Sequence, residues 1–331
     1  MKKSTTLIFL ILMLLIFFAY ITGCKKTENP IKFTQGTIPD SVYNLAGLNS
    51  QFDDYNSYVL GGTFPIIFSS NRASNGGQFD LVLGDIWFKF DQTTGAFSLG
   101  SEMLNDPFYG AVINKANTTG NDFGPYSLFS SGDGYEYLLL ASQNAGGLLD
   151  LYYLKYVPRF GSNIPYVTGP NPVKLLNSSY DDAYISFDSN QDSAYFTSNR
   201  GGNFDIYLHT RPFSKTMDSW LDQDFAASTL VDSINSGYDD KCPFVYKNVM
   251  LFTSNRPGGM GGFDLYISIF NNGNWGAPIN LGPKINTASD EYRPILFYHP
   301  DFKNMIIIFS SNRPGGLGGY DLYFTGIPIA K

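Results

Sequence analysis

The stretch FTSNRPGGMGGFDLY at residues 252–266 occurs four times in closely similar form and a fifth time in degenerate form. The other good copies are FSSNRASNGGQFDLV at 68–82, FTSNRGGNFDIY at 196–207 and FSSNRPGGLGGYDLY at 309–323, and the degenerate copy is LASQNAGGLLDLY at 140–152. Aligned on Ser70, Ser142, Ser198, Ser254 and Ser311, they lie 72, 56, 56 and 57 residues apart. A fixed period of this size indicates one supersecondary unit stacked several times.

Each copy predicts a strand, a tight turn and a second strand. Apolar residues such as Val249–Thr253 precede the turn, and the alternating run Phe263–Ile267 follows it. Glycine and asparagine tolerate positive φ in the turn itself. The aspartate after the turn is expected to accept hydrogen bonds from the turn's backbone donors. These turn-bonding residues are Asp80, Asp150, Asp205, Asp264 and Asp321.

An acidic pair and a short strand precede each copy. The pairs are Asp53-Asp54, Asp181-Asp182, Asp239-Asp240 and Asp290-Glu291, with Asn121-Asp122 in the degenerate repeat. A further apolar element, clearest at residues 277–282, precedes the acidic pair. Four antiparallel strands in roughly 50 residues are typical of one β-propeller blade. The sequence therefore predicts an all-β protein, a single five-bladed β-propeller of four-stranded antiparallel blades.

The two ends of the chain indicate how the ring closes. The last repeat stops after its third strand, and residues 41–46 match the missing fourth-strand element. We expect this N-terminal strand to complete the last blade, because such an exchange removes exposed sheet edges. The first repeat is longer than the others, so a degenerate sixth blade within residues 84–120 stays open.

The Ser-Asn-Arg-Pro-Gly-Gly-x-Gly-Gly-x-Asp-Leu-Tyr pattern resembles the TolB-type, WD-repeat-like propeller repeat found in envelope proteins of the Bacteroidetes. The resemblance covers residues 41–331, nearly all of the chain after the leader. It implies a propeller fold and says little about function, although one reading it suggests is a TolB-like component of an envelope complex.

The N-terminus has the features of an exported lipoprotein. Lys2 and Lys3 precede an apolar run of about fifteen residues that is short for a membrane span, and Ile21-Thr22-Gly23-Cys24 resembles a bacterial lipobox. The alternative is a single anchor helix. We expect a signal peptide at 1–23, lipid attachment at Cys24, a tether over 24–39 and the propeller over 40–331. Lys25 after the cysteine resembles the signal for outer-membrane sorting. Whether the protein faces the periplasm or the cell surface stays open.

The charge composition of the chain limits the classes of partner that it is expected to bind. Without Lys2 and Lys3 the chain has 20 basic and 29 acidic side chains, a net charge of −9. An acidic domain without a basic patch argues against nucleic acid and against contact with membranes other than through the lipid. We expect a monomer that binds an envelope protein or a glycan and uses no cofactor.

Polar residues that recur from repeat to repeat are expected to surround one mouth of the central channel. This ring comprises Asp53, Asp181, Asp239, Asp290, Arg72, Arg200, Arg256 and Arg313. The degenerate repeat lacks both the first acid and the arginine, having Asn121 and Asn144 instead. Because an orphaned, partly buried charge is unfavourable, the loss of both residues in the same repeat suggests that they are partners. We therefore hypothesise that each arginine binds the first acid of its own blade, or the backbone beside that acid.

These observations favour a binding or scaffolding module over an enzyme, because a group repeated in every blade suits a structural tie better than asymmetric catalysis. His209 and His299 are the only histidines, which argues against a catalytic triad or a multi-histidine metal site. No catalytic residue and no metal site are assigned, and whether the channel binds a cation stays open. The enzymatic alternative is a glycan-acting hydrolase using channel carboxylates. The irregular segments 84–120, 157–172 and 210–224 are further candidates for ligand contact.

Overall fold

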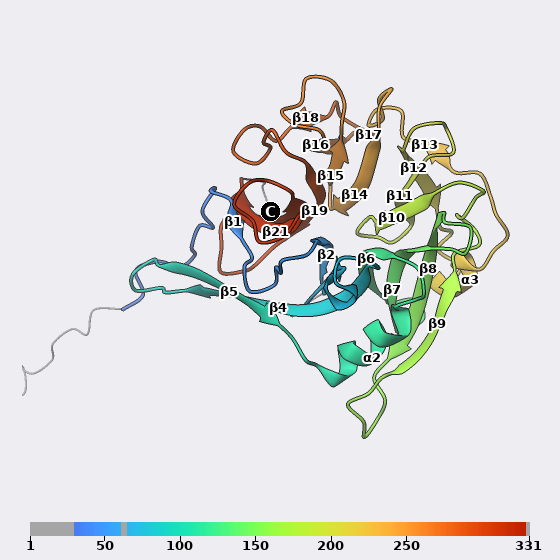
Figure 1. Ribbon diagram of the computed structural model, residues 1–331, viewed down its shortest axis with the longest axis horizontal. Coiled ribbons are helices and arrows are strands. Elements are labelled where there is room, and N and C mark those ends of the chain that lie inside the picture. Colours follow the sequence, from blue (N-terminus) through green and yellow to red (C-terminus); the bar gives the residue numbers. More distant parts are fainter. Residues whose placement is uncertain (1–29, 61–64, 329–331) are drawn as a thin grey trace, which may run out of the picture.

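A computed structural model describes residues 30–60 and 65–328 and contains five antiparallel sheets arranged around a central axis (Figure 1). Blade 1 comprises β2 (Asp54–Val59), β3 (Pro65–Ser70), β4 (Asp80–Phe90) and β5 (Phe97–Met103). Blade 2 comprises β6 (Asp122–Ser130), β7 (Tyr135–Gln143), β8 (Leu149–Val157) and β9 (Tyr166–Pro172). Blade 3 comprises β10 (Asp182–Phe187), β11 (Ser193–Ser198), β12 (Asp205–Thr210) and β13 (Thr229–Leu230). Blade 4 comprises β14 (Asp240–Tyr246), β15 (Val249–Ser254), β16 (Asp264–Asn271), β17 (Asn274–Trp275) and β18 (Ile279–Asn280). Blade 5 comprises β19 (Glu291–Phe297), β20 (Met305–Ser311), β21 (Asp321–Ile327) and β1 (Tyr43–Asn44).

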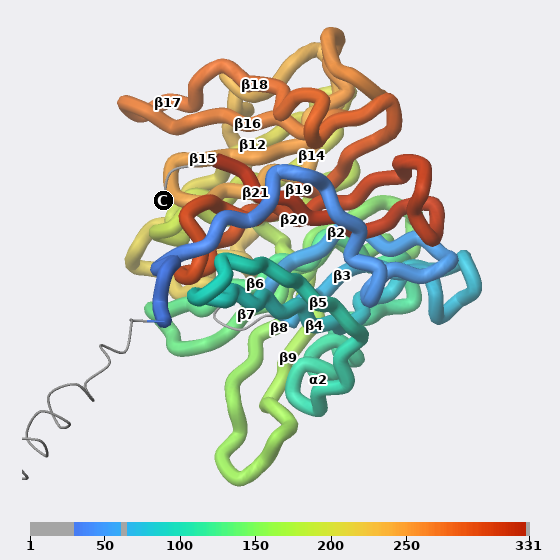
Figure 2. Tube along the Cα trace, turned by 90° about the vertical axis from the view of Figure 1, so that its left-hand side faces the viewer, coloured from blue at the N-terminus to red at the C-terminus, as the bar shows by residue number. Residues whose placement is uncertain are grey.

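The ring is closed by the N-terminal strand, as the sequence predicts. β1 pairs antiparallel with β21, Tyr43 opposite Phe324, and the N-terminal segment crosses the last blade in Figure 2. The inner strands β2, β6, β10, β14 and β19 contact one another all the way around. The predicted five-bladed, all-β propeller is therefore confirmed.

The long first repeat adds to blade 1 instead of forming a sixth blade. β4 continues to Phe90 and forms a hairpin with β5, and helix α2 (Pro107–Ala116) follows. Asp106 caps α2 by accepting a hydrogen bond from the Tyr109 N–H, and Pro107 occupies the first turn, where its missing N–H has no consequence. Val112, Ile113 and Ala116 are buried against blades 1 and 2. The repeat is long because the helix covers one edge of the ring.

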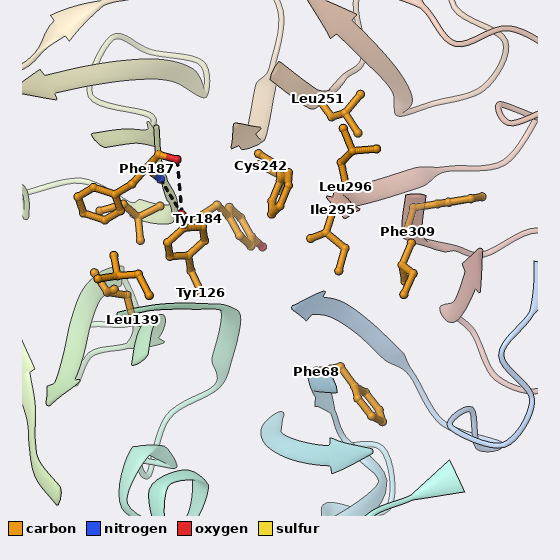
Figure 3. Packing of buried hydrophobic residues seen from close by; sticks show 14 of the residues in the cluster. Phe68, Tyr126, Leu139, Tyr184, Phe187, Cys242, Leu251, Ile295, Leu296 and Phe309 are labelled. Atoms are coloured by element: carbon orange, nitrogen blue, oxygen red, sulfur yellow. Dashed lines mark hydrogen bonds between the residues drawn. The ribbon is translucent and has the colours of Figure 1, made fainter. Parts of the chain in front are cut away.

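The core lies between the blades. Second-strand aromatic residues Phe68, Phe196, Phe252 and Phe309 occupy the same register position and are fully buried, with Leu140 in their place in blade 2. Part of this packing, near the inner strands, appears in Figure 3. The remaining short elements are a 3-10 turn, η1 (Arg72–Ser74), and α3 (Met217–Leu221), whose Trp220 is buried. Within the described part of the chain, neither helix has the length or apolar character needed to cross a membrane.

The expected leader at 1–23 and the lipid-attachment residue Cys24 lie outside the described residues. The described part of the expected tether lies on the propeller. Lys32 and Phe33 donate backbone hydrogen bonds to Gln92 O, and Gly36 pairs with Phe302. Ile38 is fully buried. The packed body therefore begins before residue 40.

Candidate functional site

The arginine of each regular repeat pairs with the second acid of its blade. Arg200 Nη2 lies 2.5 Å from Asp182 Oδ1, and Arg256 Nη2 lies 2.5 Å from Asp240 Oδ1. The other two pairs are Arg72 with Asp54 and Arg313 with Glu291. The hypothesis that the first acid is the partner was wrong by one residue. The physical reason is strand geometry. The second acid is the first residue of the inner strand and is buried, and it lies directly opposite the serine that stands two residues before the arginine.

Each guanidinium is enclosed by the blade that carries it. Arg256 donates to Ser254 Oγ at 3.0 Å and to the Ile234 carbonyl at 2.6 Å. Its carbon Cζ lies 5.2 Å and 5.0 Å from the ring centres of Phe252 and Tyr266. Charge-assisted hydrogen bonds and aromatic faces together satisfy the ion. These four arginines therefore join strands and loops inside a blade.

The first acid of each pair joins neighbouring blades. Asp53 accepts the Tyr320 N–H at 2.8 Å, which links blade 1 to blade 5. The same bond recurs from Leu149 N to Asp181, from Phe204 N to Asp239, from Phe263 N to Asp290 and from Phe79 N to Asn121. A Cβ on Gly319 would lie 2.3 Å from Asp53 Oδ1, so the turn needs glycine there. Asn121 makes the same contact, which explains why the degenerate repeat dispenses with the first aspartate.

Blade 2 keeps its buried acid without an arginine. Asp122 is fully buried and accepts hydrogen bonds from Thr118 N at 2.7 Å and Thr118 Oγ1 at 3.1 Å. Burial raises the pKa of Asp122 to about 6, although the hydrogen bonds from Ser142 and Thr118 oppose the shift. Asn144 binds Asp150 instead of an inner-strand acid.

The aspartates after the turns fall into two groups. Asp264 accepts the Met260 and Gly261 N–H groups, and Asp321 accepts those of Leu317 and Gly318. Where the turn is shorter or different, a side-chain amide donates instead. Those bonds run from Gln78 to Asp80, from Asn144 to Asp150 and from Asn203 to Asp205.

An aromatic pocket lies at the mouth of the channel that carries the acidic pairs. It has a volume of about 310 Å³ and is lined by Asp53, Tyr55, Phe79, Tyr184, Phe263, Tyr292 and Tyr320. We call this set the mouth pocket. Tyr55 stacks on Tyr320 with ring centres 5.6 Å apart, and Tyr292 meets Phe263 edge-on at 5.6 Å. Asp53 supplies a carboxylate within the lining, and Asp290 Oδ2 accepts the Tyr320 hydroxyl proton at 3.0 Å.

The sequence predicted acids at this mouth but missed the aromatic side chains. Tyr55 and Tyr292 each follow the second acid, and Phe79, Phe263 and Tyr320 each precede the turn aspartate. These aromatic residues recur at two fixed positions of the repeat, and this recurrence could have predicted an aromatic lining beside the acids.

A ring of unusual backbone lies below the mouth pocket. The third residue of each inner strand has positive φ, at a bulge in that strand. These residues, which we call the channel ring, are Asn56, Gly124, Tyr184, Cys242 and Arg293, with φ between 49° and 58°. Tyr184 and Cys242 lie near the centre of Figure 3. Proline follows three of these five residues, and this recurrence in the sequence could have indicated the irregular backbone.

The opposite mouth also opens into a pocket, of about 360 Å³. Apolar inner-strand residues line it, including Tyr58, Tyr126 and Phe187, with Asp188 and Gln191 at its edge. Burial raises the pKa of Asp188. Among the described residues, no group of three His, Cys, Asp or Glu side chains gathers in a way that could hold a metal ion.

Comparison with known proteins identifies the fold without naming a family. No family model and no curated protein matches the chain. A thermostable family-43 glycoside hydrolase is similar in structure, with a TM-score of 0.50 and 13% identity over 84% of this chain and 90% of that one. A protein of unknown function from Dyadobacter fermentans gives a TM-score of 0.48 at 12% identity, covering 88% and 98%. TolB from Acinetobacter baumannii gives 0.36 at 14% identity, covering 81% of this chain and 52% of TolB.

These likenesses concern the fold. The TolB-type propeller indicated by the repeats is confirmed at that level by the five blades. The prediction that the chain is not an enzyme was wrong, because the same propeller is the fold of a glycoside hydrolase. Repetition of structural ties around a ring is therefore no argument against activity at its mouth.

Proposed function

We propose that this chain is an envelope lipoprotein whose propeller takes a glycan into the mouth pocket. The observation that supports this proposal best is the concave lining of five tyrosine and phenylalanine rings besides Tyr184, with one carboxylate among them. Sugar rings present flat C–H faces that stack on aromatic side chains, and a few polar groups fix their orientation. A pocket of about 310 Å³ is smaller than the surface that a stable protein partner would bury, which favours a saccharide.

The attachment of the N-terminal segment supports the same reading. Residues 32–36 lie against Gln92 and Phe302, which belong to the β4–β5 and β19–β20 turns. In a blade these turns emerge on the face opposite the acidic pairs. A protein tethered through Cys24 would therefore present the mouth pocket away from its own membrane.

A second candidate function is hydrolysis of the bound glycan. It is favoured by the two carboxylates that reach the same mouth from neighbouring blades, Asp53 in the lining and Asp290 on the Tyr320 hydroxyl. Glycoside hydrolysis uses a pair of carboxyl groups, one as acid and the other as nucleophile or base.

Binding of a panel of envelope and plant-type oligosaccharides to the purified protein tests the main proposal. We expect Tyr55→Ala to weaken the binding by about fivefold, since stacking on one aromatic ring contributes on the order of 1 kcal/mol. Tyr246→Ala at the opposite mouth is the matched control and should leave the affinity unchanged. If no saccharide binds, or if both variants lose affinity equally, the mouth pocket is not the site.

Asp53→Asn separates binding from hydrolysis. Asparagine preserves the inter-blade hydrogen bond, as Asn121 shows at the same position of blade 2. Turnover by the parent protein that disappears in Asp53→Asn, with binding retained, would establish the hydrolase. Retained turnover in this variant would exclude Asp53 from the chemistry.

A further inference from the structure

Arg293 differs from the four blade arginines because it has no acidic partner. It is fully buried in the channel ring, and its side chain makes one hydrogen bond, from Nη2 to the Pro125 carbonyl at 2.9 Å. Its Nε and Nη1 have no hydrogen-bond partner. Among the described residues its guanidinium forms no ion pair, whereas those of Arg72, Arg200, Arg256 and Arg313 all do.

The groups around Arg293 are neutral. Its Cζ lies 5.5 Å from the ring centre of Tyr184. The other ionisable groups that influence it are Cys242, Tyr58 and Tyr126. Burial raises the pKa of Cys242 to about 12 and raises that of Tyr126 as well, so both are protonated at neutral pH. The guanidinium keeps its proton in proteins, so a positive charge remains on the axis without a countercharge.

Asn56 presents a second unsatisfied group to the same space. It is fully buried, and neither its Nδ2 nor its Oδ1 makes a hydrogen bond of regular geometry. The amide nevertheless lies close enough to the Tyr184 hydroxyl to oppose the rise that burial causes in the pKa of that tyrosine. Arg293 starts in blade 5 and reaches the Pro125 carbonyl of blade 2. Blade 1, which carries Asn56, stands between those two blades in the ring. Arg293 lies over the Tyr184 ring and the Asn56 amide acts on the Tyr184 hydroxyl, so both groups face the same tyrosine.

We propose that the channel ring holds one small inorganic anion of chloride size between the Arg293 guanidinium and the Asn56 amide. A buried, unpaired charge is strongly unfavourable, and an anion removes that penalty while occupying the free donors Nε, Nη1 and Nδ2. Aromatic side chains line the two mouths on either side of the ring, which favours a small ion over a larger ligand. This site is independent of the glycan proposed at the mouth pocket.

Crystals of the parent protein grown with sodium bromide test the proposal directly. We expect one anomalous bromide peak on the channel axis within hydrogen-bond distance of Arg293. The proposal is wrong if no bromide peak lies on the axis. It is also wrong if the density there gives no anomalous signal and therefore represents water.

Thermal unfolding provides the second test. At constant ionic strength, replacing sodium gluconate with sodium chloride should raise the Tm of the parent protein by several degrees, because a ligand bound only to the folded state stabilises it. Asn56→Asp should abolish this rise, since aspartate tolerates the φ of 58° and supplies a built-in countercharge. Asn75→Asp, the same change at an exposed residue with φ of 55°, should retain it. Equal chloride dependence in Asn56→Asp and the parent would contradict the site.

Discussion

At the scale of single residues, one repeat position behaves differently in different blades. The second acid begins every inner strand and is fully buried in all five blades, as Asp54, Asp122, Asp182, Asp240 and Glu291. Four of these carboxylates form an ion pair with an arginine. Burial still raises the pKa of Glu291, although Arg313 opposes the shift. Asp122 has only hydroxyl and backbone donors, and its pKa rises to about 6. The same repeat position therefore holds a buried acid with an arginine partner in four blades and without one in blade 2.

The same substitution should thus have opposite effects in blades 2 and 3. Because the pKa of folded Asp122 lies above its ordinary 3.8, the folded protein holds the extra proton between about pH 4 and 6, and stability falls as the pH rises through this window. Asp122→Asn should stabilise the protein at pH 7 by roughly 1–3 kcal/mol and flatten this part of the profile. Some slope should remain, because burial also raises the pKa of Asp205 to about 6.

Asp182→Asn is the matched comparison. It leaves Arg200 without its countercharge and should destabilise the protein by about 3–5 kcal/mol at pH 7. Urea unfolding of both variants from pH 4 to 8 measures these effects. A loss of stability in Asp122→Asn at pH 7 would show that its carboxylate is satisfied in the folded protein.

At the scale of elements, an asparagine holds the third strand of every blade. Asn177 donates to the Leu151 carbonyl and accepts the Leu151 N–H, and Asn235 does the same with Ile206. Asn117, Asn286 and Asn49 repeat this pair of bonds with Leu81, Leu265 and Leu322. In blade 5 the asparagine comes from the N-terminal segment, 273 positions away in sequence. The contact that connects successive blades elsewhere therefore closes the ring here.

Asn49→Ala should loosen the closure specifically. Loss of two hydrogen bonds at the buried Leu322 backbone should lower the free energy of unfolding by about 1–3 kcal/mol. It should also expose the segment around β1 to limited proteolysis. Asn177→Ala removes the equivalent bonds inside the ring and should lower stability similarly without increasing cleavage near residues 41–48. Equal cleavage patterns in the two variants would argue against a special role of Asn49 in closure.

At the scale of the whole molecule, the propeller has two different mouths. The aromatic mouth pocket lies on the side of the acidic pairs, and the N-terminal segment is fastened to turns on the other side. An anchor before residue 30 would therefore hold the propeller with its pocket facing outward.

Cys24→Ser tests the proposed anchor. We expect the protein to move from the membrane fraction to the soluble fraction of the producing cells, since a serine cannot take up the thioether-linked lipid. Cys242→Ser changes the other cysteine, which is buried in the channel ring, and should leave the protein in the membrane fraction. Unchanged membrane association of Cys24→Ser would favour the alternative of an anchor helix.

The repeats were enough to predict a ring of five blades and their order, because a repeated strand-turn-strand unit cannot bury its apolar faces except against copies of itself. Only the structure excluded a sixth blade within residues 84–120, which form the β4–β5 hairpin and α2. The sequence by itself also determined the closing strand, since residues 41–46 match the element that the last repeat lacks. The tertiary structure alone decided which acid each arginine binds, because side chains at adjacent strand positions point in opposite directions. It likewise decided what faces the channel. Each inner strand has one bulge residue with positive φ, and only when five blades surround the channel do Arg293 and Asn56 become buried with side-chain donors left unpaired.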